Sequence, residues 1–166
     1  QLVLLDSDFS AMPLAVEEGR RCINNIQRSA SLFLVKTIFS FLLSVMFLFS
    51  SSAYPFQPIQ LTLISALFIG APSFLLALEP NKDRVQGRFI ANVLKKALPG
   101  GLTVVLGIGA LLVLQNIFSI PQERLSVMAV YVTAGVLYGV LFRVCKPFRK
   151  WHIIMLAVVP AVFCAA

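Results

Sequence analysis

The chain has 166 residues, of which 58% are hydrophobic and 13% are charged, and its formal net charge is +7. Its mean hydropathy of +0.88 excludes a soluble domain of this length, because one core could not bury so much apolar surface. The basic residues are scattered between apolar runs, which argues against nucleic acid as a partner and fits a membrane-topology signal.

Residues 1–12 differ in kind from the rest of the chain. A short β-like run, Leu2 to Leu5, leads into "DSDFS", whose acidic and hydroxyl side chains are candidate helix caps. We interpret this run and the turn after it as a soluble strand that leads into the helix that follows.

A long uninterrupted helix is predicted from Pro13 to Ser50. Proline suits the first turn of a helix, and only Gly19 weakens the helical pattern that follows. About 38 residues at about 1.5 Å each span nearly 57 Å, against about 30 Å of bilayer hydrocarbon. We therefore expect residues 13–28 to form a stalk outside the membrane that continues into the first membrane helix.

Five apolar segments have lengths near the roughly 20 residues that cross a bilayer. They are residues 30–50, 59–78, 98–118, 125–142 and 151–166. The predicted fold class is an all-α membrane protein, in which residues 29–166 form a bundle of about five transmembrane helices. The last segment is short for a full crossing, so we expect the chain to be a piece of a longer protein.

The polar connections predict the orientation of the bundle. Apart from Lys36, twelve Lys and Arg residues lie before the first span, between the second and third, or between the fourth and fifth. One basic residue, Arg124, lies in the connections of the opposite side. Because basic residues concentrate on the cytoplasmic side, we expect the N-terminus and the stalk to be cytoplasmic.

Lys36 stands inside an otherwise apolar stretch, "LFLVKTIFSFLLS". Two interpretations stay open. The side chain lies close enough to the membrane surface to reach water with its charged end, or it faces the protein interior as an internal cation that takes part in transport. Thr37, Ser40 and Ser44 fall within the same quarter turn of the helix as Lys36, which favours a shared polar face.

The second span carries a matching set of polar and helix-breaking residues. Ser65 and Pro72 are seven positions apart and share a face, and the break from Gly70 to Pro72 would free backbone carbonyls that a cation could use. The simpler explanation for each serine is close helix packing with a hydroxyl bonded to its own backbone. Glu79, the acid that ends this span, is either an interfacial residue or part of an ion entry or exit.

Few residues suit metal or nucleophilic chemistry. The three cysteines are far apart and lack metal-site spacing, and His152 is the single histidine. An imidazole-based metal site or catalytic triad is therefore not expected within this chain, and any metal ligand set is unknown.

The stretch "LLDSDFSAMPLAVEEGRRCINNIQRS" resembles the segment of P-type ATPases that leaves the phosphorylation domain and becomes the fifth of ten membrane helices. The matching residues are Asp6, Asp8, Phe9, Ser10, Val16, Glu18, Gly19, Arg20 and Asn24, with Asn25 beside them. The stretch "PIQLTLISALFIGAPSFLLALEPN" is similar to the sixth helix, from Pro58 and Gln60 through Gly70 and Pro72 to Pro80. The pattern is closest to the bacterial calcium and metal-cation branch.

This resemblance implies the membrane-transport part of a pump that couples ATP hydrolysis to cation translocation in a bacterial plasma membrane. Residues 1–12 then end the cytoplasmic phosphorylation domain, and the stalk residues Glu18, Gly19, Arg20 and Asn24 transmit its movements. The implied partners are the bilayer, the transported cation, and the N-terminal membrane helices and cytoplasmic domains that this chain lacks. Mg²⁺ and ATP are implied for the intact protein.

The chain departs from the family at two points. The motifs "DKTG", "TGE" and "GDGxND" are absent, so this chain alone should not hydrolyse ATP. The positions of the calcium ligands fall on Thr37, Ser40, Ser65, Phe68 and Ile69, none of which is a carboxylate, and Ca²⁺ prefers carboxylate oxygens. A proton or monovalent-cation pump therefore remains an alternative, as does a small non-enzymatic channel or assembly subunit.

Overall fold

The computed structural model describes residues 12–50, 53–81, 83–84, 87–146 and 150–165. Within these ranges every regular element is helical, which confirms the predicted all-α fold. The elements are α1 (Met12–Leu48), α2 (Pro58–Ser65), the π-helix η2 (Ala66–Gly70), α3 (Ala71–Ala77), α4 (Phe89–Phe118), α5 (Gln122–Val144) and α6 (Lys150–Ala165). Four crossings, namely α1, the α2–η2–α3 unit, α4 and α5, are long and apolar enough to span a membrane, and α6 is shorter.

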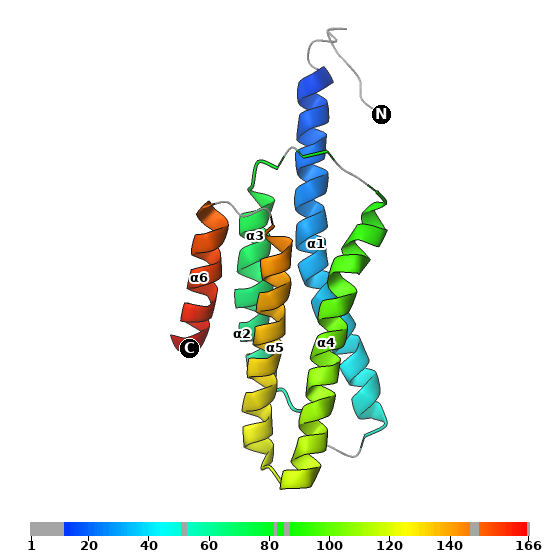
Figure 1. Cartoon of the computed structure of the whole chain (residues 1–166), viewed down its shortest axis with the longest axis vertical. Coiled ribbons are helices and arrows are strands. Elements are labelled where there is room, and N and C mark those ends of the chain that lie inside the picture. The colour runs from blue at the N-terminus through cyan, green and yellow to red at the C-terminus, as the bar shows by residue number, and fades with distance from the viewer. Residues whose placement is uncertain (1–11, 51–52, 82, 85–86, 147–149, 166) are drawn as a thin grey trace.

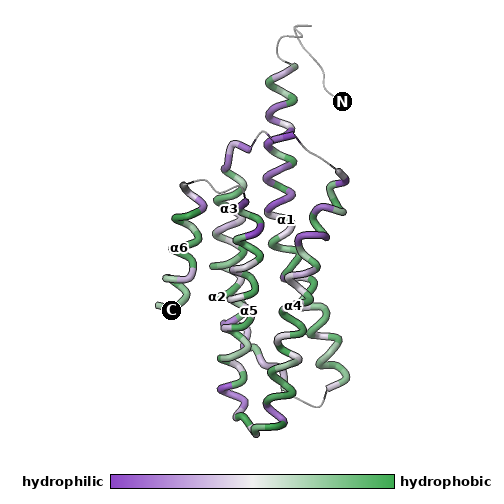
Figure 2. The backbone as a smooth tube through the Cα atoms, in the orientation of Figure 1, coloured by the Kyte–Doolittle hydropathy of each residue, from purple (hydrophilic) through white to green (hydrophobic). Residues whose placement is uncertain are grey.

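The first helix is the longest element, with 37 residues, which at about 1.5 Å per residue corresponds to about 55 Å. Figure 1 shows its N-terminal part reaching beyond the ends of the other helices, and Figure 2 shows hydrophilic residues interleaved along that part. The long helix predicted from the sequence is therefore present, and it ends two residues before Ser50. We call residues 13–28 the stalk. The β-like run at Leu2–Leu5 lies outside the described residues.

The second crossing is one apolar run divided into three helical pieces. Pro58 opens α2, and the side chain of Gln60 accepts a hydrogen bond of 3.0 Å from the backbone N–H of Gln57. The helix widens at η2, where the N–H of Ala71 donates to the carbonyl of Ala66. Because Pro72 follows directly and has no N–H, the carbonyl about one turn before it loses its usual donor.

The helix of the third crossing begins before the predicted apolar span. Helix α4 starts at Phe89, whereas the apolar segment was expected from residue 98. Hydropathy detects only the apolar part, but a helix can continue through exposed basic residues such as Lys95 and Lys96, because its hydrogen bonds are made within the backbone. Helix α5 likewise begins three residues before the predicted 125 and ends two residues after 142.

The tightest packing lies where α4 crosses α1 and α5. A β-carbon added to Gly100 would lie 2.5 Å from Val140 of α5, and one added to Gly101 would lie 2.6 Å from Ile38 of α1. Small residues let membrane helices approach closely, which is the role of this glycine pair. The buried face of α1 repeats at three- and four-residue spacing, with Leu32, Val35, Phe39 and Leu43 at 0–1% exposure.

Candidate functional site: the polar faces and the stalk junction

The polar face predicted on α1 borders the buried face of that helix. Lys36 and Ser40 are half-buried, and Thr37 and Ser44 are exposed. The hydroxyl of Thr37 donates to the carbonyl of Phe33 at 3.2 Å, and that of Ser44 to the carbonyl of Ser40 at 2.8 Å. These two hydroxyls therefore bond their own helix, as in the simpler packing interpretation.

The polar residues of the second crossing lie at the π-helix. Ser65 immediately precedes η2 and donates to the carbonyl of Leu61, one turn earlier. Gly70 ends the π-helix, and Pro72 is buried in the first turn of α3. No hydrogen bond among the described residues joins this crossing to the Lys36 face of α1. The structure thus places the irregular backbone where the sequence predicted it, and leaves the role of these residues a prediction.

Carboxylate and thiol ligands do not gather anywhere in the part of the chain that the structure describes. No group of three or more His, Cys, Asp or Glu side chains there could hold a metal ion.

The stalk is tied by hydrogen bonds to the segment that follows α3. The side-chain amide of Asn24 donates to the carbonyl of Asp83 at 2.8 Å, and that of Asn25 donates to the carbonyls of Ala77 at 3.0 Å and Glu79 at 2.7 Å. The amide of Asn25 thereby satisfies carbonyls at and just after the end of α3, and the amide of Asn24 satisfies one in the segment that follows. The stalk therefore holds the backbone at this end of the second crossing.

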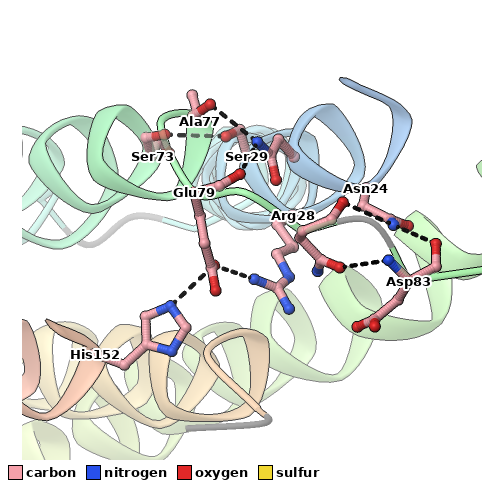
Figure 3. Close-up of polar contacts among 10 residues, drawn as sticks. Asn24, Arg28, Ser29, Ser73, Ala77, Glu79, Asp83 and His152 are labelled. Carbon is pink, nitrogen blue, oxygen red and sulfur yellow. Dashed lines mark hydrogen bonds and ion pairs between the residues drawn. The ribbon is translucent and has the colours of Figure 1, made fainter. Parts of the chain in front are cut away.

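A buried charge cluster lies next to these amides (Figure 3). The guanidinium of Arg28 donates to Oε2 of Glu79, and Nε2 of His152 lies 3.1 Å from the same oxygen. The three side chains are 7–10% exposed and come from α1, the residues after α3, and α6. Three segments that are far apart in the sequence therefore meet at one carboxylate oxygen.

Cys145, at the end of α5, stands close to this cluster. Burial raises the pKa of its thiol to about 11, an effect that the Arg28 charge opposes and the Glu79 carboxylate reinforces. The thiol therefore stays protonated at neutral pH, and no metal or redox role is indicated.

The structure places the four residues predicted to couple the stalk in different surroundings. Of the four residues predicted to couple the stalk, Asn24 is the one with a hydrogen bond to another element in the described part of the chain. Glu18 pairs with Arg21 on the same exposed surface, Gly19 is exposed with open space around it, and Arg20 is half-buried.

Sequence reasoning missed the contacts of Arg28, Glu79 and His152. Arg28 was counted as a topology signal and Glu79 as an interfacial or ion-pathway residue, whereas the two form a buried ion pair. One signal could have found it: a lone acid at the end of an apolar span needs a cationic partner, and a basic residue lies at the same end of the neighbouring helix.

The helices and the tied stalk define a multi-pass helical membrane protein. A calcium-transporting ATPase, CtpE, of Mycolicibacterium smegmatis is 35% identical to this chain over an alignment of 171 positions, gaps included. The alignment covers 95% of this chain and 22% of that relative. A probable cation-transporting ATPase, exp7, of Streptococcus pneumoniae is 34% identical over 163 residues, which cover 93% of this chain and 21% of that relative. A P-type sodium-transporting ATPase4 of Toxoplasma gondii is 31% identical over 83 residues, half of this chain.

The chain spans about a fifth of the length of the bacterial relatives it matches. No protein-family model and no solved structure matches it. The predicted resemblance is confirmed by the relatives: the chain matches a membrane region of bacterial calcium- and cation-transporting P-type ATPases.

Proposed function

We propose that this chain is the transport region of an ATP-driven cation pump, with calcium or another metal cation as the favoured cargo. The bacterial relatives are named as calcium- and cation-transporting ATPases, which supports this cargo, and their greater length supports a longer intact protein. The basic residues favour a cytoplasmic N-terminus, a bacterial plasma membrane is the expected location, and the intact protein would bind Mg²⁺ and ATP outside this chain.

The observation that carries the proposal is the hydrogen bonding between the stalk and the segment after α3. Asn24 and Asn25 hold the backbone carbonyls of Ala77, Glu79 and Asp83, so a displacement of the stalk moves the end of the second crossing with it. That crossing contains the π-helix and Pro72, where backbone oxygens are released from regular helical bonding. A pull on the stalk would in this way reshape the part of the bundle best suited to bind and release a cation.

Transport by the intact protein tests this proposal. Purified full-length protein in vesicles of phosphatidylethanolamine and phosphatidylglycerol should hydrolyse Mg²⁺-ATP and take up at least one metal cation of a panel that includes Ca²⁺. Stimulation of hydrolysis by that cation is expected to be at least about tenfold, in the range of typical coupling free energies. Cation flux without ATP hydrolysis would instead identify a channel, and the absence of both would favour an assembly subunit.

A proton or monovalent-cation pump is the second candidate, and Lys36 is the observation that favours it. A half-buried lysine on the first membrane helix can act as an internal counter-charge. The positions at which calcium ligands were predicted carry no carboxylate. The Toxoplasma relative, which is named as a sodium-transporting ATPase, also matches half of this chain.

Lys36→Ala in the full-length protein separates the two interpretations of this lysine. If Lys36 is an internal cation, the half-saturating cation concentration for ATP hydrolysis should shift by about 5- to 150-fold, with a changed pH profile. Lys95→Ala, which removes an exposed lysine from α4, is the matched control and should shift neither. Unchanged ion dependence and an unchanged pH profile in Lys36→Ala would assign this side chain to the membrane surface.

A further inference from the structure

One carboxylate oxygen connects the stalk to the last helix of the chain. Oε2 of Glu79 accepts a hydrogen bond from Arg28 of the stalk and lies 3.1 Å from Nε2 of His152 in the first turn of α6. Figure 3 shows the carboxylate between the two side chains, which approach it from opposite directions. Residues 28 and 152 are thus linked through a residue that belongs to neither helix.

The backbone that carries Glu79 is itself fixed to the stalk. Asn25 donates to the carbonyl of Glu79 at 2.7 Å, and Ser29, one turn further along, donates to the carbonyl of Ser73 at 3.1 Å. The position of Glu79 is therefore held by Asn25 and Arg28 of the stalk, while Ser29, on the same face of α1, holds α3 just before it. The carboxylate of Glu79 projects from there to α6.

A groove between α3 and α6 leaves part of their facing surfaces without direct contact. An apolar groove of about 650 Å³ separates the two helices, lined among others by Leu75, Met155 and Val158. Glu79 and His152 close the groove at the end nearest the stalk. Near the other end of α6, Phe163 packs against Phe68 of η2 and Tyr131 of α5, with ring centroids 5.3 and 5.8 Å apart. The charged contact therefore fixes the end of α6 that lies nearest the stalk, where the groove interrupts the apolar packing.

Stability alone is a poor explanation for a buried cluster of this kind. A buried ion pair usually stabilises no better than well-packed apolar side chains of the same volume, because both charges lose their hydration. Its directional hydrogen bonds do define geometry, since each polar group is satisfied in one arrangement. The Arg28–Glu79–His152 cluster is therefore suited to holding three elements in register during movement.

We propose that Glu79 is a positioning residue that makes α6 move together with the stalk, so that stalk displacement reaches α6 as well as the second crossing. This inference rests on the proposed function, in which the stalk transmits ATP-driven movement. Without the carboxylate, the stalk would still move the second crossing through Asn24 and Asn25, but the position of α6 relative to the stalk would no longer be fixed.

The first measurement compares cation transport with ATP hydrolysis in full-length protein reconstituted in vesicles. Glu79→Gln, which preserves side-chain size but removes the charge, should lower the number of cations transported per ATP by about 3- to 30-fold. Glu123→Gln, an exposed acid in the first turn of α5, is the matched control and should leave this ratio unchanged. A proportional loss of transport and hydrolysis in Glu79→Gln, with an unchanged ratio, would overturn the proposal.

The second measurement follows the geometry without using catalysis. Spin labels are attached to Cys22 of the stalk and Cys164 of α6, which are both exposed, and they report the distance between the two helices. Cys145 is buried and stays unlabelled, and the other cysteines of the intact protein are replaced. The wild type should give a narrow distance distribution and Glu79→Gln a broader one. Identical distributions would overturn the link, whatever the activity.

These measurements distinguish a failure of the proposed function from a failure of the link through Glu79. If the wild type shows no ATP-driven transport, the proposed function fails, while the distance distributions still decide whether Glu79 holds α6. If Glu79→Gln does not reach the membrane, the Arg28→Gln/Glu79→Gln double variant replaces it, because it leaves neither charge unpaired. His152→Gln, which retains an N–H donor toward the carboxylate, should restore most of the coupling ratio that His152→Ala loses.

Discussion

Replacing Gly101 by leucine is expected to prevent the bundle from assembling. Even a β-carbon at this position would lie 2.6 Å from Cγ2 and 3.0 Å from Cβ of Ile38, and 3.6 Å from the backbone nitrogen of Phe39. A leucine adds three more carbons, so α1 and α4 would have to separate along their contact. Overpacking typically costs about 1–3 kcal/mol, and leucine against a neighbouring backbone should reach or exceed the upper value.

The matched control for this substitution lies on the same helix. A β-carbon at Gly109 meets no atom within 4 Å, so Gly109→Leu adds the same side chain to α4 without a clash. Size-exclusion chromatography and thermal unfolding of the detergent-solubilised full-length protein measure the outcome. Gly101→Leu should aggregate or unfold at a clearly lower temperature than Gly109→Leu, and equal behaviour of the two would contradict the close approach of α1 and α4.

Removing Arg28 alone is expected to destabilise the protein more than removing the whole ion pair. Arg28→Met leaves the carboxylate of Glu79 buried without its guanidinium partner, a change that typically costs about 3–5 kcal/mol. Because His152 remains beside the same oxygen, we expect a loss at the lower end of that range. Arg28→Met/Glu79→Leu should recover most of the lost stability, since two apolar side chains of similar size then fill the site.

An exposed pair on the same helix provides the comparison. Arg21→Met breaks the contact with Glu18, and both side chains are substantially exposed, so little change in stability is expected. Thermal unfolding of the four proteins, wild type included, measures these differences. A double variant that is less stable than Arg28→Met would contradict the account of the buried pair.

The membrane class, the long first helix and the approximate positions of the crossings could be predicted because each depends on local properties. Apolar runs of about 20 residues and the continuity from Pro13 onward are visible in the sequence and are preserved in α1, α5 and the α2–η2–α3 unit. Helix α4 begins nine residues before the predicted apolar span, because hydropathy marks the membrane part of a helix and not the helix itself.

The candidate site was predictable only where it follows a single helix. The shared sector of Lys36, Thr37, Ser40 and Ser44 follows from helical geometry, and so does the break before Pro72. The hydroxyls of Thr37, Ser44 and Ser65 each donate to the backbone carbonyl four residues earlier in the same helix. Helical spacing alone permits such a contact.

The sequence by itself determined that this protein is a helical membrane protein with a projecting first helix, because hydropathy and helical continuity act over neighbouring residues. It also carried the resemblance to P-type ATPases, since motifs are strings of residues. Only the tertiary structure decided which charges meet. Arg28, Glu79 and His152 are separated by 51 and 73 positions, and their contact depends on how α1, α3 and α6 pack around one another. Burial then makes that contact obligatory, because a charge removed from water needs a partner.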